Sequence, residues 1–182
     1  MVREAGAMIG HRGCGALVLK TRQQIPPLTV RTPAGHTVRA WDYKQKKNLV
    51  IALLHAGCRR CEDFLNKLAA RAAELAEREA VALVVFAEAP RAMLSENLPA
   101  QVLLAADMSG RSQRAYLGED VFGSSGQQRV GVFVADRYGE LYAQWVARDD
   151  DGLPGVGELL DWLAQIQVAC EECGVSHWPA DS

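Results

Sequence analysis

The stretch Leu49-Val-Ile-Ala-Leu-Leu-His-Ala-Gly-Cys-Arg-Arg-Cys61 decides the fold of this chain. It opens with an uninterrupted apolar run, which is typical of a strand covered on both faces of a sheet. From Cys58 to Glu79 apolar side chains recur at the spacing of one amphipathic helix, and a second apolar run follows at 81–86. Strand, helix and strand in this order predict a βαβ unit with two parallel strands.

The flanking sequence predicts the rest of the sheet. Residues 28–32 and 36–40 surround a Pro-Ala-Gly turn and predict a β-hairpin near the N-terminus. The apolar run at 132–134 predicts a further strand, within a second hairpin over 130–146. The predicted sheet is therefore mixed, with parallel strands in its centre and hairpins beside them.

Two more helices are expected after the βαβ unit. A short helix is predicted at 109–117, with Ser109 capping its start and Gly118 its end. The final helix is expected to carry one apolar face made of Leu159, Leu163, Ile166 and Cys170. The sum is an α/β fold with a central mixed β-sheet, helices on both faces and an N-terminal β-hairpin extension.

Length and composition indicate one globular domain. The 182 residues are 49% hydrophobic and 23% charged, which is enough apolar material for a core without cross-links. Residues 1–23 contain several glycines and no sustained period, so we expect an irregular N-terminal arm there. The domain is predicted at 24–173, followed by a C-terminal tail at 174–182.

Charge and hydropathy exclude several classes of partner. The 20 Lys and Arg residues against 22 Asp and Glu residues give a net charge of -2, which provides no positive field for a phosphate backbone. No nucleic acid is therefore expected. The first 20 residues lack the apolar stretch of a secretory signal, and the apolar run at 80–87 is far shorter than a bilayer requires. We expect a cytoplasmic protein without a membrane partner, in a compartment that keeps thiols reduced.

The cysteine spacing carries the strongest chemical signal. The chain has five cysteines, for which chance predicts about 0.1 Cys-x-x-Cys spacings. The sequence has two, Cys58-Arg-Arg-Cys61 and Cys170-Glu-Glu-Cys173. Cys14 is left over and is expected to be unpaired.

Cys58 is expected to open a helix directly after a buried strand. The N–H groups and the positive dipole end found there stabilise a thiolate, and Arg59 and Arg60 add positive charge beside it. We therefore predict that Cys58 attacks, and that Cys61, one turn further on, resolves the intermediate disulfide. Half of a zinc site and an inert buried pair are the competing interpretations.

The second pair has three interpretations. Cys170 and Cys173 are a secondary redox or resolving pair, a pair packed in the core or tail, or metal ligands. With Cys58 and Cys61 they would make a four-cysteine zinc site, although the gap between the pairs lacks the local spacing typical of such sites.

Several segments resemble one family. The sequence from about Gln24 to Ala169 is similar to the thioredoxin-fold redoxins, specifically the alkyl hydroperoxide reductase and thiol-specific antioxidant group that includes the peroxiredoxins. The matching segments are Pro27-Leu-Thr-Val-Arg-Thr-Pro-Ala-Gly-His-Thr-Val38, Lys46-Lys-Asn-Leu-Val-Ile51, Leu54-His-Ala-Gly-Cys-Arg-Arg-Cys61, Tyr116-Leu-Gly118 and Arg129-Val-Gly-Val-Phe-Val-Ala-Asp136, followed by Gly139.

The resemblance implies a thioredoxin-like fold with Cys58 as the peroxidatic or nucleophilic thiol. It also places Arg129 where peroxiredoxins hold the arginine that orients the peroxide. His55 stands where the family has threonine, Ile51 where it has proline, and Val130-Gly131 where thioredoxins hold a cis-proline.

Two polar side chains are candidates to support Cys58. An imidazole changes charge near neutral pH, so His55 is a candidate proton donor or charge partner, with hydrogen-bonded packing as the other interpretation. Arg129 is the second candidate, with an ordinary surface ion pair as its alternative.

The resulting hypothesis is a thiol-dependent oxidoreductase of the peroxiredoxin-like or thioredoxin-like type. Its substrate is expected to be a peroxide or a protein disulfide, and its reductant a thioredoxin-like or other dithiol. A homodimer is left open. No cofactor is expected because glycine-rich nucleotide loops are absent, and no metal is required. The alternative is a non-catalytic thioredoxin-fold binding module whose cysteine pairs hold a structural zinc.

Overall fold

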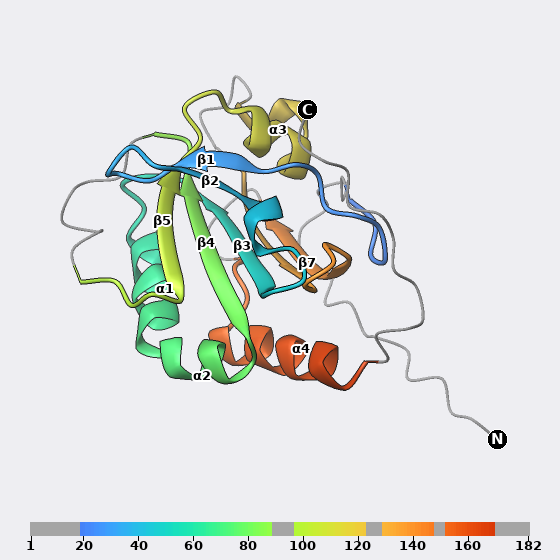
Figure 1. Cartoon of the computed structure of the whole chain (residues 1–182). Helices are drawn as coiled ribbons and strands as arrows, with labels where there is room; N and C mark the ends of the chain where they lie inside the picture. Colours follow the sequence, from blue (N-terminus) through green and yellow to red (C-terminus); the bar gives the residue numbers. More distant parts are fainter. Residues whose placement is uncertain (1–18, 89–96, 123–128, 148–151, 170–182) are drawn as a thin grey trace.

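The computed structural model describes residues 19–88, 97–122, 129–147 and 152–169 (Figure 1). These residues form one seven-stranded mixed sheet in the order β2-β1-β5-β4-β3-β6-β7. The predicted α/β fold with a mixed sheet is confirmed. Cys14, Cys170, Cys173 and the predicted tail at 174–182 lie outside the described residues.

The centre of the sheet consists of the predicted apolar runs. Strands β3 (Asn48–Leu54) and β4 (Ala80–Phe86) are buried at every residue and pair in parallel. Strand β5 (Val102–Ala106), which the sequence pattern did not reveal, pairs in parallel with β4. On the other side β6 (Val130–Ala135) runs antiparallel to β3, and β7 (Leu141–Ala147) completes the predicted hairpin.

The crossover helix of the βαβ unit is broken, contrary to the prediction of one helix from Cys58 to Glu79. It consists of α1 (Arg59–Ala70) and α2 (Ala72–Glu77), separated by Arg71. Arg71 has φ -108 and ψ 21, and its N–H donates to the carbonyls of Leu68 and Ala69. The second helix therefore begins after a tightened turn, although the apolar spacing continues through it.

Two apolar layers cover the sheet. Side chains of α1, α2 and α4 (Val156–Val168) pack on one face, against residues of β3 that include Val50, Ala52 and Leu54. On the opposite face α3 (Arg111–Leu117) and the N-terminal segment pack against a layer that includes Leu49, Ile51 and Leu53. The alternating residues of β3 thus face different layers, and helices cover both faces as predicted.

The start of α3 is capped by the predicted Ser109 and also by Asp107, which the sequence analysis did not predict. The carboxylate of Asp107 accepts hydrogen bonds from the backbone N–H groups of Ser112 and Gln113, at 2.7 and 3.1 Å. The Ser109 hydroxyl accepts a hydrogen bond from the N–H of Arg111, the first residue of α3, at 3.2 Å, as the predicted cap requires. It also donates to Asp107 at 2.7 Å, so the serine supports the second capping residue. At the other end Gly118, with φ 100, follows the last helical residue as predicted.

The final helix ends before the second cysteine pair. Helix α4 buries Leu159, Leu163 and Ile166, as its pattern predicts, but its last residue is Val168. Ala169 already has an extended backbone, with φ -71 and ψ 142. The predicted place of Cys170 on the apolar face falls outside the described residues.

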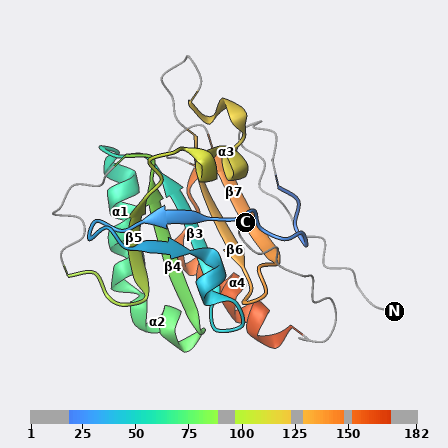
Figure 2. The same ribbon diagram turned by 45° about the horizontal axis from the view of Figure 1, so that its top comes forward.

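The predicted N-terminal hairpin is present as β1 (Thr29–Arg31) and β2 (Thr37–Arg39), followed by the 3-10 helix η1 (Ala40–Tyr43). It joins the sheet antiparallel to β5 and runs across the central strands in Figure 2. Before the hairpin, Leu19 is buried, and Arg22 forms an ion pair of 2.6 Å with Glu140. Residues 19–25 therefore pack on the domain itself.

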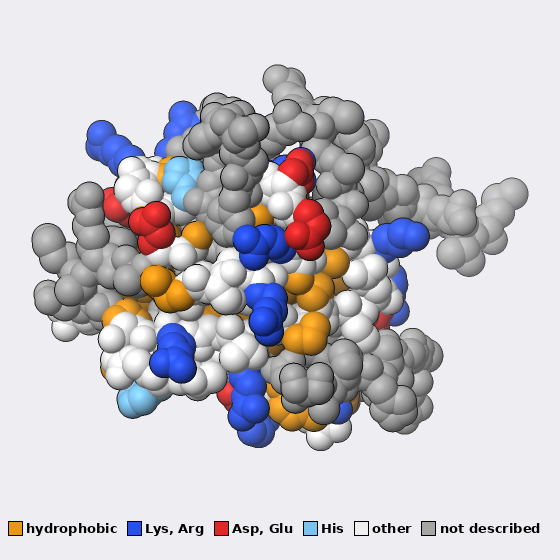
Figure 3. All heavy atoms as spheres, turned by 90° about the horizontal axis from the view of Figure 1, so that it is seen from above, with side chains coloured by type: hydrophobic (Ala, Val, Ile, Leu, Met, Phe, Trp, Pro, Cys, Tyr) orange, Lys and Arg blue, Asp and Glu red, His pale blue; other side chains and the backbone are white. Residues whose placement is uncertain are grey.

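The surface features agree with the charge balance of the sequence. On the face seen in Figure 3 the visible Lys and Arg side chains lie among neutral, apolar and acidic surface. In the described part of the chain, no helix has both the length and the apolar character needed to cross a bilayer.

Candidate active site

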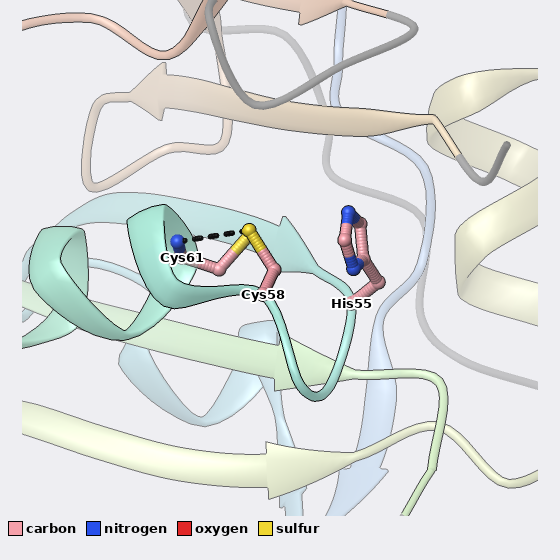
Figure 4. A group of neighbouring side chains, drawn as sticks. All are labelled: His55, Cys58 and Cys61. Atoms are coloured by element: carbon pink, nitrogen blue, oxygen red, sulfur yellow. Dashed lines mark hydrogen bonds between the residues drawn. The ribbon is translucent and has the colours of Figure 1, made fainter.

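The Cys-x-x-Cys pair lies where the central strand passes into the first helix. Strand β3 ends at Leu54 and α1 begins at Arg59, so four residues reverse the chain. Gly57 makes this possible because its φ is 75, in the left-handed region that favours glycine. A fully buried strand on one side and the packed helix on the other hold Cys58 at a fixed place (Figure 4).

Cys58 is the N-cap residue of α1. Its backbone is extended, with φ -91 and ψ 115, and its Sγ accepts a hydrogen bond from the backbone N–H of Cys61 at 3.2 Å. The sulfur occupies the position in which serine or aspartate oxygens usually satisfy a helix N-terminus. The sulfur therefore faces a backbone donor and the positive end of the helix dipole. The structure thus places Cys58 as the sequence predicts.

The two cysteines differ in exposure. Cys58 retains 7% of its surface, whereas Cys61 is fully buried. They are not joined in a disulfide. Arg59 and Arg60, between them in sequence, are exposed. An incoming molecule therefore meets Cys58 before Cys61, with two positive charges close along the chain.

His55 belongs to the same group. It follows β3 directly and is half-buried, and its imidazole lies beside Cys58 in Figure 4. An imidazole nitrogen and the sulfurs of Cys58 and Cys61 all lie within 4.8 Å of one another. Three side chains that can each carry or release a proton are therefore assembled around the start of α1.

Arg129 is held by other partners. Its Nη1 donates to the carbonyl oxygen of Leu117 at 2.9 Å, and its Nη2 donates to Asp120 at 2.7 Å. Leu117 ends α3, which packs on the face of the sheet opposite to the cysteines. These bonds direct the guanidinium toward α3 and the 3-10 helix η3 (Glu119–Phe122). A role for Arg129 beside Cys58 stays a prediction.

The sequence analysis did not name two contacts of this region, and a local signal predicts only one of them. Asp120, the ion-pair partner of Arg129, is nine residues from it and fits no helical or strand period. The bond from the Cys61 N–H to the Cys58 sulfur follows from the predicted helix start, because an N-cap side chain is placed to accept from the backbone three residues on. The geometry of a cap was therefore readable, whereas the ion pair was not.

Two carboxyl groups with a raised pKa lie at the other end of β6. Burial raises the pKa of Asp136 and of Glu140, both of which occupy the turn between β6 and β7. Asp136 accepts hydrogen bonds from the N–H groups of Tyr138 and Glu140, at 2.9 and 2.8 Å. Ala135 beside it pairs with Leu49, the opposite end of β3 from the cysteines. These groups stabilise a turn and lie apart from the site.

Comparisons with known proteins define the fold. No family model matches the chain, and no curated protein matches it. Among solved structures, the chain is similar to a protein described as the thiol:disulfide interchange protein DsbE from Chlorobium tepidum. The identity is 18% over 80% of this chain and 99% of that one, with a TM-score of 0.57.

Peroxiredoxin structures are also similar. Peroxidoxin BcpB from Mycobacterium tuberculosis matches with 17% identity over 81% of this chain and 98% of that one, at a TM-score of 0.67. A yeast mitochondrial 1-Cys peroxiredoxin matches with 14% identity over 82% and 77%, at a TM-score of 0.65. The chain has a thioredoxin-like fold, as the resemblance in its sequence predicts. It is the fold that these redoxins share.

Proposed function

We propose that this protein is a thiol-dependent oxidoreductase in which Cys58 attacks the substrate and Cys61 resolves the intermediate. One observation carries the proposal. The Cys58 sulfur caps α1 and accepts the Cys61 N–H at 3.2 Å, while Cys61 lies buried one turn inside. The thioredoxin-like fold supports it, because the neighbouring structures include a thiol:disulfide interchange protein and peroxiredoxins.

With a peroxide, the Cys58 thiolate attacks the nearer oxygen and breaks the O–O bond. Cys58 becomes a sulfenic acid, and the departing oxygen takes a proton and leaves as alcohol or water. Cys61 then attacks the Cys58 sulfur, which forms the disulfide and releases water. The substrate gains two electrons, and the cysteine pair loses them.

With a disulfide, the Cys58 thiolate attacks one substrate sulfur and expels the other as a thiolate. Cys61 then attacks Cys58 in the mixed disulfide and releases the second substrate thiol. In both reactions a thioredoxin-like or other dithiol must reduce the Cys58–Cys61 disulfide. The proposal includes a cytoplasmic location, because that compartment supplies such reductants.

Two observations bear on the substrate. The low exposure of Cys58, 7%, favours a small molecule such as a peroxide over a folded protein disulfide. The bonds of Arg129 to Leu117 and Asp120 favour the disulfide, because they engage the guanidinium that would orient a peroxide. Each substrate therefore has one structural argument, and the assay below compares them directly.

His55 is proposed as the proton carrier. Its imidazole lies within 4.8 Å of both sulfurs, so it can accept the Cys61 proton when that thiol attacks. It is partly exposed and can exchange this proton with solvent.

The test is the fate of the thiols in the reduced full-length chain. One equivalent of hydrogen peroxide or of oxidised glutathione is added, thiols are counted, and peptides are mapped by mass spectrometry. We expect loss of two thiols and a Cys58–Cys61 linked peptide. The ratio of the two rates identifies the preferred substrate.

Single variants separate the two roles. Cys58→Ser is expected to stop the reaction, whereas Cys61→Ser should accumulate a Cys58 sulfenic acid or a mixed glutathione disulfide. Cys14→Ser is the matched control and should react like the unaltered chain. A linked peptide that does not contain Cys58, or full reactivity in Cys58→Ser, contradicts the proposal.

A further inference from the structure

The three side chains at the start of α1 also form the donor set of a metal ion. His55, Cys58 and Cys61 offer one nitrogen and two sulfurs, all within 4.8 Å of one another. Two thiolates and an imidazole are ligands that zinc prefers over oxygen-seeking cations such as magnesium or calcium. The spacing His-x-x-Cys-x-x-Cys places all three on one short segment of chain.

The distances fit a tetrahedral ion. Zinc–sulfur bonds of about 2.3 Å and zinc–nitrogen bonds of about 2.0 Å place neighbouring donor atoms about 3.5–3.8 Å apart. The donors of this chain lie within 4.8 Å of one another and therefore need to close by about 1.3 Å at most. Rotation of the half-buried His55 side chain, which follows the last residue of β3, can bring its nitrogen closer to the sulfurs without displacing the strand.

Charge and burial favour a dication at this place. Cys61 is fully buried and Cys58 is 7% exposed, so two thiolates there would repel each other in surroundings poor in water. One Zn²⁺ bound by two thiolates and a neutral imidazole forms a site with no net charge. The Cys61 N–H on the Cys58 sulfur resembles the outer hydrogen bonds that orient metal ligands.

We propose that His55, Cys58 and Cys61 bind one Zn²⁺ through three protein ligands. Within the described residues no further His, Cys, Asp or Glu joins this group, so one coordination position is left for water or a small ligand. This site differs from the four-cysteine set that the sequence suggested, because His55 takes the place of Cys170 and Cys173.

The proposal does not depend on the redox function, but it has a consequence for it. The ion needs both thiolates, and a disulfide sulfur carries no negative charge to offer. Zinc binding and the Cys58–Cys61 disulfide therefore exclude each other. Bound zinc would hold the pair reduced and keep it from attacking a substrate.

The experiment uses the reduced, full-length, metal-free chain titrated with Zn²⁺ and, separately, with Co²⁺. We expect one zinc per chain to survive gel filtration in chelator-free buffer. Co²⁺ should give the charge-transfer band of a thiolate ligand and the intense visible bands of a tetrahedral site. In the unaltered chain, zinc should protect Cys58 and Cys61 from alkylation, while prior oxidation of the pair abolishes binding.

Variants identify the ligands. Loss of an outer-shell partner already costs about 10–100-fold in metal affinity, so His55→Ala should cost at least about 100-fold. His55→Cys, which restores a zinc ligand, should recover most of it. The matched control His36→Ala, at an exposed histidine, and the double variant Cys170→Ser with Cys173→Ser should bind as the unaltered chain does.

The outcomes separate this proposal from the proposed function. Absence of stoichiometric zinc, or binding that survives His55→Ala but is lost without the second pair, overturns the three-ligand site. The three-ligand site is also overturned, without any variant, if Cys58 and Cys61 are alkylated as fast with zinc as without it. A chain that binds no zinc yet forms the Cys58–Cys61 disulfide retains the redox function. If the chain binds zinc but its metal-free form makes no Cys58–Cys61 disulfide, the redox function is contradicted and the zinc site stands.

Discussion

Replacing Gly131 by alanine tests how tightly the strand beside the site is packed. A Cβ at this position would lie 2.5 Å from Leu117 Cδ2 and 3.0 Å from Phe133 Cε2. Ordinary carbon–carbon contacts are about 3.5–4.0 Å. Leu117 must therefore move by about 1 Å, and it is fully buried in the layer that also contains Tyr116 and Phe133.

The magnitude follows from two opposing effects. Overpacking a filled core costs about 1–3 kcal/mol, and replacing glycine by alanine returns about 0.4–1 kcal/mol through the unfolded chain. We expect Gly131→Ala to lose about 1–2 kcal/mol of the free energy of unfolding. For a chain of this length, that lowers the Tm by about 2–8 °C.

The assay is thermal and urea unfolding followed by circular dichroism. Gly155→Ala is the matched control, because a Cβ at Gly155 has nothing within 4 Å and the φ there is -68. Gly155 is the N-cap residue of α4, where alanine is less favourable than glycine, and this loss offsets the gain through the unfolded chain. Its free energy of unfolding should therefore change by less than about 0.5 kcal/mol. If Gly131→Ala melts at or above the temperature of the unaltered chain, the close approach of β6 to α3 is refuted.

Three further substitutions test buried polar groups. Burial raises the pKa of Asp136 above 3.8, so deprotonation opposes folding and the unaltered chain loses stability as the pH rises through that pKa. Asp136→Asn keeps the oxygen that accepts from Tyr138; it should therefore raise the Tm at neutral pH, and the gain should vanish in melts below pH 3.8. Asp107→Ala removes the acceptor at the start of α3 and should lower the free energy of unfolding in urea by about 2–4 kcal/mol. An unchanged free energy of unfolding would count against the cap. Arg129→Met should slow the peroxide and disulfide reactions by less than about 2-fold, while it destabilises the fold by about 1–3 kcal/mol. If stopped-flow measurements show a selective loss of the peroxide rate, the guanidinium acts at Cys58 instead.

Much of the fold was readable because the decisive segments are governed by local rules. The buried strands β3 and β4 are uninterrupted apolar runs, and the two hairpins are marked by turn residues. Strand β5 was missed because Val102–Ala106 is short and contains two alanines, which do not favour strands by themselves. Its place in the sheet depends on pairing with β4, which no local pattern encodes.

The errors in the helices have the same origin. Residues around Arg71 include no glycine or proline, so the break between α1 and α2 leaves no signal in the apolar spacing. A second cap of α3, beside Ser109, comes from Asp107, four residues before the helix begins, because an intervening turn folds its carboxylate back. Spacing arguments identify elements well and their exact ends less well.

The candidate site was predicted to the extent that it is contiguous in sequence. His55, Cys58 and Cys61 lie within seven residues, and the structure assembles them. The direction of Arg129 depends on α3 and Asp120, which come from other parts of the chain. Its orientation could not be read from a motif, because it is set by the packing of two separate elements.

The position of Cys58 at the start of α1 makes the protein reactive at some cost in thermal stability. Serine is a better helix cap than cysteine, since its oxygen is the stronger acceptor for the backbone N–H that now meets sulfur at 3.2 Å. The inactive Cys58→Ser protein should therefore have a higher Tm than the unaltered protein. When the Cys58 sulfur forms a covalent bond to oxygen or to another sulfur, it becomes a weaker acceptor and the first turn of α1 is less stable. Amide hydrogen exchange at Cys61 should then become faster, so its rate reports whether the pair is reduced or oxidised.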